Sequence, residues 1–233
     1  MKRIKGILFD FNGTLFFDSE MHAQAFGLTC DAYGVERFTR EQLISGIFGR
    51  TNAKIYRDNF QSDATDEECE RFSTVKKNFY FESCLAQPDR LTLAPGAAEM
   101  LDYLKEQGIP MALATGSDRE EVDFFIEHLG ISRWFSYEKN VVYNDGSFSG
   151  KPAPDCYILA ARKIGLDPSE CAVFEDGRSG IMAANAAGCA AVIAVHEEGI
   201  PSPLGDGCEA NALYHDHTKW RETLTLLGLY GKD

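Results

Sequence analysis

An apolar run that ends in a carboxylate constrains this chain most. Gly6–Phe9 is apolar throughout, and it is followed by Asp10 and by a polar, glycine-containing turn that ends at Thr14. Such a run can form a strand that is covered on both faces in an α/β protein. Ligands in these folds bind at the carboxyl ends of the strands, which makes Asp10 a candidate active-site residue. Asp is also common in turns, so this segment alone leaves both interpretations open.

A second apolar run ends in a hydroxyl group. Ile109–Thr115 is followed by Gly116 and Ser117, just before a helix that is predicted to begin near Asp118. Backbone N–H groups at the start of a helix attract anions. The Thr115 hydroxyl and these N–H groups can therefore hold a phosphate.

Cationic and acidic residues occupy two further positions of the same kind. Lys151 lies in the proline-rich turn Gly150–Asp155, directly before a predicted helix. The apolar run Cys171–Phe174 is followed by the adjacent carboxylates Glu175 and Asp176. Two carboxylates at the end of a strand suit a hard cation that prefers oxygen ligands.

The order of these four segments resembles the haloacid dehalogenase (HAD) superfamily of phosphatases and mutases. The resemblance spans nearly the whole chain, and the branch it resembles most comprises β-phosphoglucomutase-like and phosphoglycolate-type phosphatases. This branch implies an α/β fold, a Rossmann-like parallel sheet core with an inserted helical cap domain. The matching segments are DFNGT at 10–14, ATGS at 114–117, GKPAPD at 150–155 and FEDGRSG at 174–180.

The resemblance implies a nucleophile and a metal site. Asp10 would attack phosphorus and form an aspartyl-phosphate. Mg²⁺ would be held by Asp10, Asp176 and the backbone carbonyl of Asn12, and would neutralise charge on the transferring group. Glu175 is expected to contribute to the metal site indirectly or through a water.

The resemblance also implies which residues hold the substrate. Thr115 and Lys151 would bind the remaining oxygens of the phosphoryl group as catalytic residues. Gly116 and Ser117 are expected among the substrate-binding residues. The substrate class would be a small phosphorylated metabolite.

Asn12 departs from the family pattern, which has Asp at this position. The family Asp protonates the leaving oxygen and later deprotonates the attacking water, and Asn has no titratable proton for either step. A positioned acid or base contributes about 10²–10⁴-fold, so slow turnover is expected. A water or a cap residue that supplies the proton is the alternative, and the sequence leaves open whether Asn12 is natural or engineered.

Composition bounds the class of protein. The chain has 233 residues, 44% of them hydrophobic and 25% charged, as in ordinary globular proteins. Its net charge of −13 argues against nucleic acid or an anionic membrane as a partner. Seven cysteines without a CxxC pair favour reduced thiols, and no signal peptide or membrane-spanning run is found. We expect a cytoplasmic enzyme, and the sequence leaves its oligomeric state open.

The predicted cap covers residues 16–89 and lacks a convincing buried strand. Asp18 and Ser19 are candidate N-caps for its first helix, and Thr39, with Gln42 three residues later, for its second. Three helices are expected: Ser19–Tyr33, Thr39–Phe60 and Asp66–Leu85.

The predicted core comprises residues 1–15 and 90–233, in which helices and strands alternate from Pro95 onward. Alternation of this kind predicts a parallel sheet with right-handed crossovers. A terminal helix is expected to end near Leu227. The other elements are helices at 96–107, 118–129, 154–164 and 179–187, and strands at 6–9, 109–115, 140–143, 171–174 and 190–195.

Two cap residues are candidates for substrate binding. His22 lies twelve residues after Asp10, where relatives carry a cap histidine that faces the site. A histidine with only surface or interface contacts is the equal alternative. The segment Gly46–Arg50 resembles the loop that closes over the site, and Arg50 can clamp a distal anionic group or lie solvated on a helix.

Three residues outside these segments receive weaker functional interpretations. Arg119, at the start of a predicted helix, is a minor candidate for reaching the site. His215 and His217 form an HxH pair in a polar tail without a third ligand. Both histidines are therefore expected to be solvated loop residues.

Three functions remain open from the sequence. The first is a Mg²⁺-dependent phosphohydrolase that is slowed by Asn12. The second is a phosphomutase, which needs the missing acid/base. The third is a catalytically impaired phosphate-binding or regulatory protein. Phosphonoacetaldehyde hydrolases resemble the chain less, because Lys54 does not match the position of their cap lysine.

Overall fold

The computed structural model describes residues 3–48 and 50–231. The chain divides into two compact units, and each is described by itself. The first, the core unit, comprises the residues up to Phe17 and those from Leu93 onward. The second, the helical unit, comprises Asp18–Thr92. No helix among the described residues is long and apolar enough to cross a membrane.

The core unit is built on a parallel sheet of six strands in the order β3-β2-β1-β4-β5-β6. Every neighbouring pair is parallel, as alternation in the sequence predicts. Strand β6, which is only three residues long and partly exposed, was not predicted. The strands are β1 (Gly6–Phe9), β2 (Met111–Ala114), β3 (Val141–Val142), β4 (Cys171–Glu175), β5 (Ala191–Val195) and β6 (Ala212–Tyr214).

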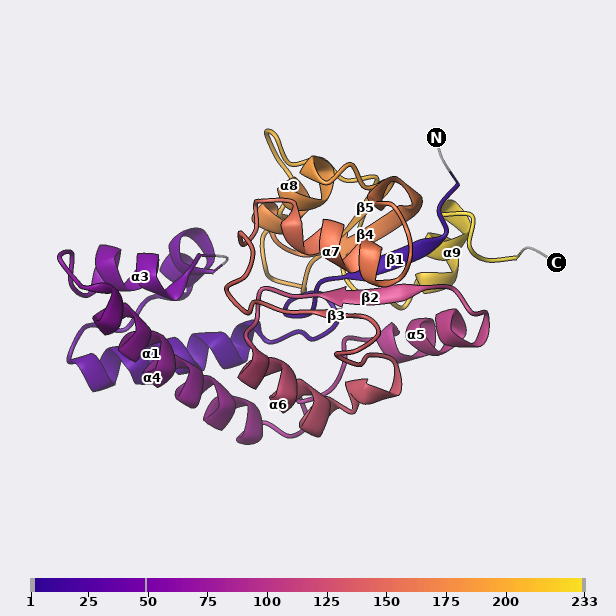
Figure 1. Cartoon of the computed structure of the whole chain (residues 1–233). Coiled ribbons are helices and arrows are strands. Elements are labelled where there is room, and N and C mark those ends of the chain that lie inside the picture. Colours follow the sequence, from indigo (N-terminus) through magenta and orange to yellow (C-terminus); the bar gives the residue numbers. More distant parts are fainter. Residues whose placement is uncertain (1–2, 49, 232–233) are drawn as a thin grey trace. The chain divides into compact units, whose positions relative to one another are not determined.

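Helices cover both faces of this sheet (Figure 1). α7 and α8 lie on one face, and α5 and α6 on the other, as right-handed crossovers from the central strand require. The four helices predicted at 96–107, 118–129, 154–164 and 179–187 are confirmed within two residues at each end, and the terminal helix ends at Leu226, next to the predicted Leu227. Their bounds are α5 (Ala97–Glu106), α6 (Arg119–Leu129), α7 (Asp155–Lys163), α8 (Arg178–Ala186) and α9 (Trp220–Leu226), with short 3₁₀ turns at Ile131–Arg133 and Pro168–Glu170.

Burial explains why the central strand is apolar throughout. Ile7, Leu8 and Phe9 are fully buried, and burying one such side chain stabilises a fold by about 1.5–3 kcal/mol. Leu8 pairs with Ala112 of β2 and with Val173 of β4. β1 thus lies between β2 and β4, and the carboxyl ends of these two strands carry the other polar candidate residues.

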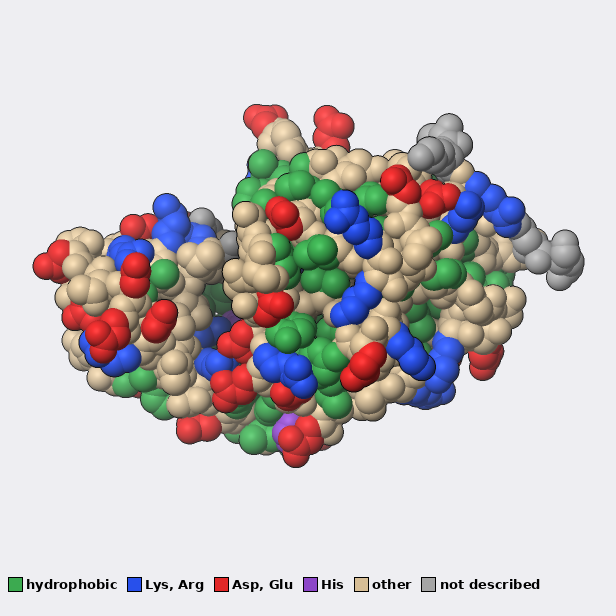
Figure 2. Space-filling view, in the orientation of Figure 1, with side chains coloured by type: hydrophobic (Ala, Val, Ile, Leu, Met, Phe, Trp, Pro, Cys, Tyr) green, Lys and Arg blue, Asp and Glu red, His purple; other side chains and the backbone are tan. Residues whose placement is uncertain are grey.

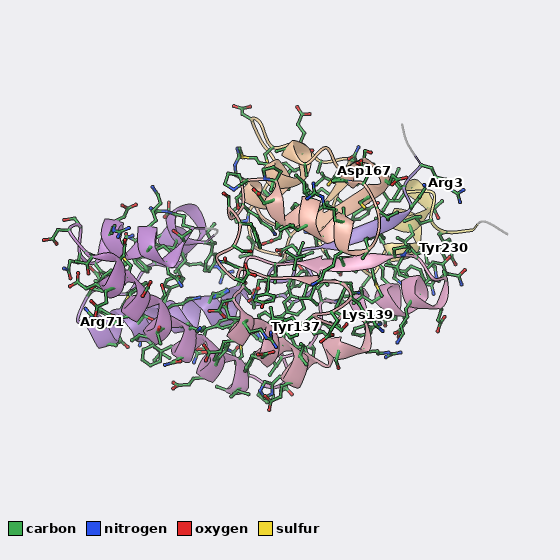
Figure 3. The ribbon with its side chains drawn as sticks, in the orientation of Figure 1. Arg3, Arg71, Tyr137, Lys139, Asp167 and Tyr230 are labelled. Atoms are coloured by element: carbon green, nitrogen blue, oxygen red, sulfur yellow. The ribbon has the colours of Figure 1, made fainter. Side chains whose placement is uncertain are left out.

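An aromatic cluster joins two helices of the core unit. The Trp220 ring of α9 packs 5.1 Å from Tyr103 of α5, and both rings contact Tyr230 (labelled in Figure 3). This cluster anchors the last helix, which begins just after the HxH segment. The C-terminal segment is therefore packed onto the core unit.

The helical unit contains α1 (Ser19–Tyr33), α2 (Arg40–Gln42), a π-helical turn (Leu43–Ile47), α3 (Asn52–Asn59) and α4 (Asp66–Leu85). The prediction of one helix over Thr39–Phe60 is wrong. The chain leaves the helix at Phe48, whose ψ is 141°, and a new helix begins after Thr51. Gly49 lies outside the described residues.

The helix starts of this unit differ in how they are capped. Thr39 and Gln42 form the predicted capping box. Asp18 occupies the N-cap position of α1, but its side chain caps no backbone N–H group. Its carboxylate is instead buried and accepts a hydrogen bond from the Tyr80 hydroxyl at 2.6 Å. Asp18 thus belongs to the interior of the helical unit.

Aromatic rings form the interior of the helical unit. Phe72 of α4 packs on Tyr56 at 4.7 Å, on Phe60 at 4.8 Å and on Tyr33 at 5.5 Å. These contacts join α1, α3 and α4. In the view of Figure 2, acidic and basic side chains are interspersed on the surface of each unit.

Candidate active site

The carboxyl ends of three adjacent strands bring the polar candidates together. Asp10 follows β1, Thr115 follows β2, and Glu175 ends β4. β1 lies between the other two strands, and the Asp10 N–H donates to the Phe174 carbonyl at 3.0 Å. All three polar residues are buried. The prediction of one site at these strand ends therefore agrees with the sheet order.

Three carboxylates lie close enough to share a cation. Asp10, Glu175 and Asp176 each offer an oxygen, and these oxygens lie within 4.8 Å of one another. The turn after β1 packs tightly against this cluster, because a Cβ atom on Gly13 would lie 2.1 Å from Asp176 Oδ2. Gly13 also has a φ of +74°, which favours glycine.

Lys151 links two of these carboxylates. Its Nζ donates to Asp10 Oδ1 at 2.5 Å and to Glu175 Oε1 at 2.6 Å. Burial raises the pKa of Asp10 to about 7, although the Lys151 ammonium lowers it. Burial also opposes the charge on Lys151, but Asp10 and Glu175 raise the pKa of the lysine well above its usual value. The lysine therefore stays charged.

The donor set fits a divalent cation. When all three carboxylates are ionised, they exceed the one ammonium group by two negative charges. Carboxylate oxygens are the ligands that a hard cation such as Mg²⁺ takes in proteins. Asp10, Asp176 and the neighbouring backbone are the groups that would hold it.

Glu175 is fixed by more contacts than its sequence position suggests. Besides Lys151, its carboxylate accepts from the Tyr157 hydroxyl at 3.1 Å and from the Gly177 N–H at 2.6 Å. A Cβ atom on Gly180 would lie 1.5 Å from Glu175 Oε1, so only glycine fits at this position in the first turn of α8. The contact of Tyr157 with Glu175 was not predicted from the sequence, since an aromatic residue in a helix with apolar periodicity is usually part of the hydrophobic core. Glu175 therefore holds Lys151 directly.

The turn after β2 contacts Asn12. The Ser117 hydroxyl donates to Asn12 Oδ1 at 2.9 Å, and the Ser117 N–H donates to Thr115 Oγ1 at 3.1 Å. Gly116 is exposed between them. The predicted residues of the two turns are thus neighbours in the core unit.

The turn that carries Asn12 is itself rigid. The N–H groups of Thr14, Leu15 and Phe16 all donate to the Phe11 carbonyl, at 3.1, 2.8 and 3.0 Å. The Thr14 hydroxyl lies 3.2 Å from Asp10 Oδ2 and 3.5 Å from Asp176 Oδ1. Thr14 therefore touches both carboxylates, a role that the sequence did not reveal.

His22 belongs to a buried polar cluster inside the helical unit. Its Nε2 lies 3.2 Å from Asp18 Oδ2, its Nδ1 lies 2.7 Å from Lys76 Nζ, and its ring stacks on Tyr80 at 4.4 Å. The buried lysine beside His22 is thus Lys76, whereas Lys54 is exposed. Lys76 lies four residues before Tyr80, so both side chains lie on the buried face of α4. This spacing is the sequence signal from which a buried lysine could have been predicted.

The two candidate arginines make local contacts. Arg50 donates to the Gly46 carbonyl at 2.7 Å and pairs with Asp58 within the helical unit. Arg119 is not at the strand-end cluster. Its guanidinium lies 3.8 Å from the ring of Tyr137 (labelled in Figure 3) and pairs with Asp123 at 3.3 Å on the exposed side of α6.

The expectation for the HxH pair is half wrong. His215 is exposed, and its ring lies 4.5 Å from that of His196. His217 is only 2% exposed, and its Nε2 hydrogen-bonds the Thr14 carbonyl at 2.8 Å. A contact across 203 residues has no local sequence signal.

Comparison with known proteins assigns the family. The model of the haloacid dehalogenase-like hydrolases matches residues 4–188. The chain belongs to this family, and the predicted superfamily is confirmed. The enzyme class predicted from the sequence, a phosphatase of the HAD type, agrees with this membership.

Relatives and solved structures are similar over most of the chain. Protein CbbY of Rhodobacter capsulatus is 31% identical, over 83% of this chain and 86% of its own length. Fructose-1-phosphate phosphatase YqaB of Escherichia coli is 29% identical, over 82% and 96%. A HAD hydrolase of family IA, variant 3, from Entamoeba histolytica superposes with a TM-score of 0.85 at 32% identity, over 97% of this chain and 100% of its own.

Proposed function

We propose that this chain is a Mg²⁺-dependent phosphohydrolase that acts on a small phosphorylated metabolite, with the helical unit as its cap. One observation carries the proposal: Asp10 is hydrogen-bonded to Lys151 within a cluster that fits a divalent cation. The names of relatives that act on sugar phosphates support a phosphorylated sugar as the substrate.

Asp10 is the nucleophile in this proposal. One of its carboxylate oxygens forms a bond to phosphorus while the bond from phosphorus to the leaving oxygen breaks. The leaving oxygen departs with the bonding electron pair. A water then attacks phosphorus, the bond to Asp10 breaks, and inorganic phosphate is released. Bound Mg²⁺ supplies neutralising charge to the transferring group.

The other groups of the core unit bind and orient the phosphoryl oxygens. Lys151 is held in place by Glu175, so its ammonium group is directed at the nucleophile before substrate arrives. The Thr115 hydroxyl accepts from the Ser117 N–H and can therefore donate its own proton to a phosphoryl oxygen. Preorganised donors of this kind need no rearrangement during the reaction.

Asn12 restricts the leaving group. Its amide can donate a hydrogen bond to the departing oxygen but cannot transfer a proton to it. Substrates whose leaving oxygen is a weak base are therefore favoured. A phosphomutase remains the less favoured alternative, since a mutase moves protons between two hydroxyl groups of a sugar.

Asn12 also favours a second function of another class, a phosphate-binding protein with impaired catalysis. Turnover of p-nitrophenyl phosphate with Mg²⁺ separates the two, because its aryl leaving group needs little protonation. We expect measurable Mg²⁺-dependent hydrolysis that is lost in Asp10→Asn. Phosphate binding without hydrolysis would support the impaired protein instead. A screen of sugar phosphates then identifies the substrate.

A further inference from the structure

We propose that His217 is a positioning residue for the reaction, acting through Thr14 on the carboxylates of Asp10 and Asp176. This inference rests on the proposed function. It makes the active site depend on a C-terminal segment that carries none of the family's sequence signatures. Three sets of contacts support it.

The side chain of His217 fixes the backbone of the catalytic turn. Its Nε2 lies 2.8 Å from the Thr14 carbonyl, and both residues are buried. A carbonyl oxygen can only accept, so Nε2 carries the proton and donates. The ring is also seated 5.7 Å from Phe174, the residue before Glu175. The imidazole therefore contacts both the turn after β1 and strand β4.

Thr14 passes this constraint to the reacting groups. Its carbonyl accepts from His217, while its hydroxyl lies 3.2 Å from Asp10 Oδ2 and 3.5 Å from Asp176 Oδ1. A displacement of the Thr14 backbone would move that hydroxyl relative to both carboxylates. The hydrogen bond from His217 to the Thr14 carbonyl opposes such a displacement.

The backbone of His217 is equally well fixed. Its N–H donates to the Pro95 carbonyl at 2.9 Å, and a Cβ atom on Gly96 would lie 2.4 Å from the His217 carbonyl group. The adjacent Ala94 N–H donates to the Leu15 carbonyl at 2.8 Å. His217 thus reaches Thr14 from an anchored position, as a residue that orients another group must.

A buried apolar side chain would fill this space with less cost than an imidazole, whose polar atoms need partners. The use of a histidine here points to its directed N–H group. Gln is the matched replacement, because its amide nitrogen can occupy the position of Nε2. Leu fills similar volume without a donor.

The test compares His217→Gln with His217→Leu. For each variant, kcat and KM for p-nitrophenyl phosphate and the Mg²⁺ concentration at half-saturation are measured. Mg²⁺ binding is measured separately by calorimetry without substrate. We expect Leu to lower kcat by about 10- to 100-fold, as small misplacements of reacting groups do, to weaken Mg²⁺ binding several-fold and to leave KM nearly unchanged. Gln should restore both readouts.

Trp220→Phe is the control for general destabilisation. Trp220 is buried in the same C-terminal segment but packs on Tyr103 and Tyr230 instead of Thr14. Its thermal melting temperature is compared with those of the His217 variants. An equal loss of kcat in Trp220→Phe, or a Gln variant as poor as Leu, would overturn the proposal.

A second route covers the case in which His217→Leu does not fold. Thr14→Val removes the hydroxyl and keeps the carbonyl that His217 binds. It should reproduce the loss of kcat and of Mg²⁺ affinity, and unchanged values would reject the proposal. If the parent chain hydrolyses nothing, the proposed function fails, but calorimetric Mg²⁺ binding in the same variants still decides the role of His217.

Discussion

Lys151 Nζ donates to Asp10 Oδ1 at 2.5 Å, although the two residues lie 141 positions apart in the chain. In the proposed function, the lysine would bind a phosphoryl oxygen next to the nucleophile Asp10. A buried ammonium group beside carboxylates also compensates their charge. Its removal should therefore affect both chemistry and local stability, with chemistry affected most.

Lys151→Ala should lower kcat for p-nitrophenyl phosphate by about 10²–10³-fold, as the loss of one preorganised donor to a developing oxyanion does. Steady-state kinetics at saturating Mg²⁺ measures it. Lys5→Ala is the matched control, because Lys5 pairs with Glu170 at 2.6 Å on the surface. Equal activity of the two variants would show that Lys151 has no role in the chemistry.

Tyr157→Phe isolates a single hydrogen bond. It removes the hydroxyl that donates to Glu175 at 3.1 Å and keeps the buried ring. We expect a loss of about 1 kcal/mol in the free energy of unfolding and a several-fold drop in kcat, since Glu175 would hold Lys151 less firmly. Chemical denaturation and steady-state kinetics measure the two effects. A Tyr157→Phe variant with unchanged kcat would restrict this hydroxyl to a structural role.

The stability of the chain should fall at acidic pH partly through His217. Burial lowers the pKa of His217 below its usual 6.5. Between the lowered pKa and 6.5 the unfolded chain binds the proton and the folded chain does not, so stability rises with pH there and is fully present above 6.5.

Urea denaturation of the parent chain and of His217→Gln at several pH values tests this. The Gln variant has no titrating group at this position, so its stability should fall less between pH values above and below 6.5. Parallel pH profiles for the two proteins would show that His217 is not buried in its neutral form.

Much of the site could be predicted because parallel strands end at one edge of a sheet. Asp10, Thr115 and Glu175 each end or follow a buried apolar strand, and the sheet order brings them together. A resemblance then suggested a role for each residue. These signals are local, and they lie within single short segments of the chain.

Predictions were wrong or missing for residues whose contacts join distant segments of the chain. His217 was expected to be a solvated loop residue, and Lys76 was given no role, because their partners Thr14 and His22 lie far away in the sequence. The helix predicted over Thr39–Phe60 failed for another reason. Its apolar spacing continues across the break at Phe48, and periodicity alone cannot locate such a break.

Asn12 carries the last prediction, because the proposed function implies an acid/base Asp at this position. Acyl and aryl phosphates should be hydrolysed much faster than alkyl phosphates, since their departing oxygen needs little protonation. Dephosphorylation of Asp10 would still lack a base, so a burst followed by slow turnover is expected. Rapid-mixing kinetics with p-nitrophenyl phosphate measures the burst.

Asn12→Asp tests the same residue by introducing the carboxylate that Asn12 lacks. The new carboxylate would still accept from Ser117, whose hydroxyl lies 2.9 Å from Asn12 Oδ1, so the turn should keep its geometry. Steady-state hydrolysis of alkyl phosphates should rise by about 10²–10⁴-fold, the contribution of a general acid/base group. Ser117→Ala in both backgrounds is the control for the shared hydrogen bond.

A parent chain that already hydrolyses alkyl phosphates rapidly, and is unchanged by Asn12→Asp, would mean that another group transfers the proton. His22, with its ring held between Asp18 and Lys76, would then be the first residue to replace.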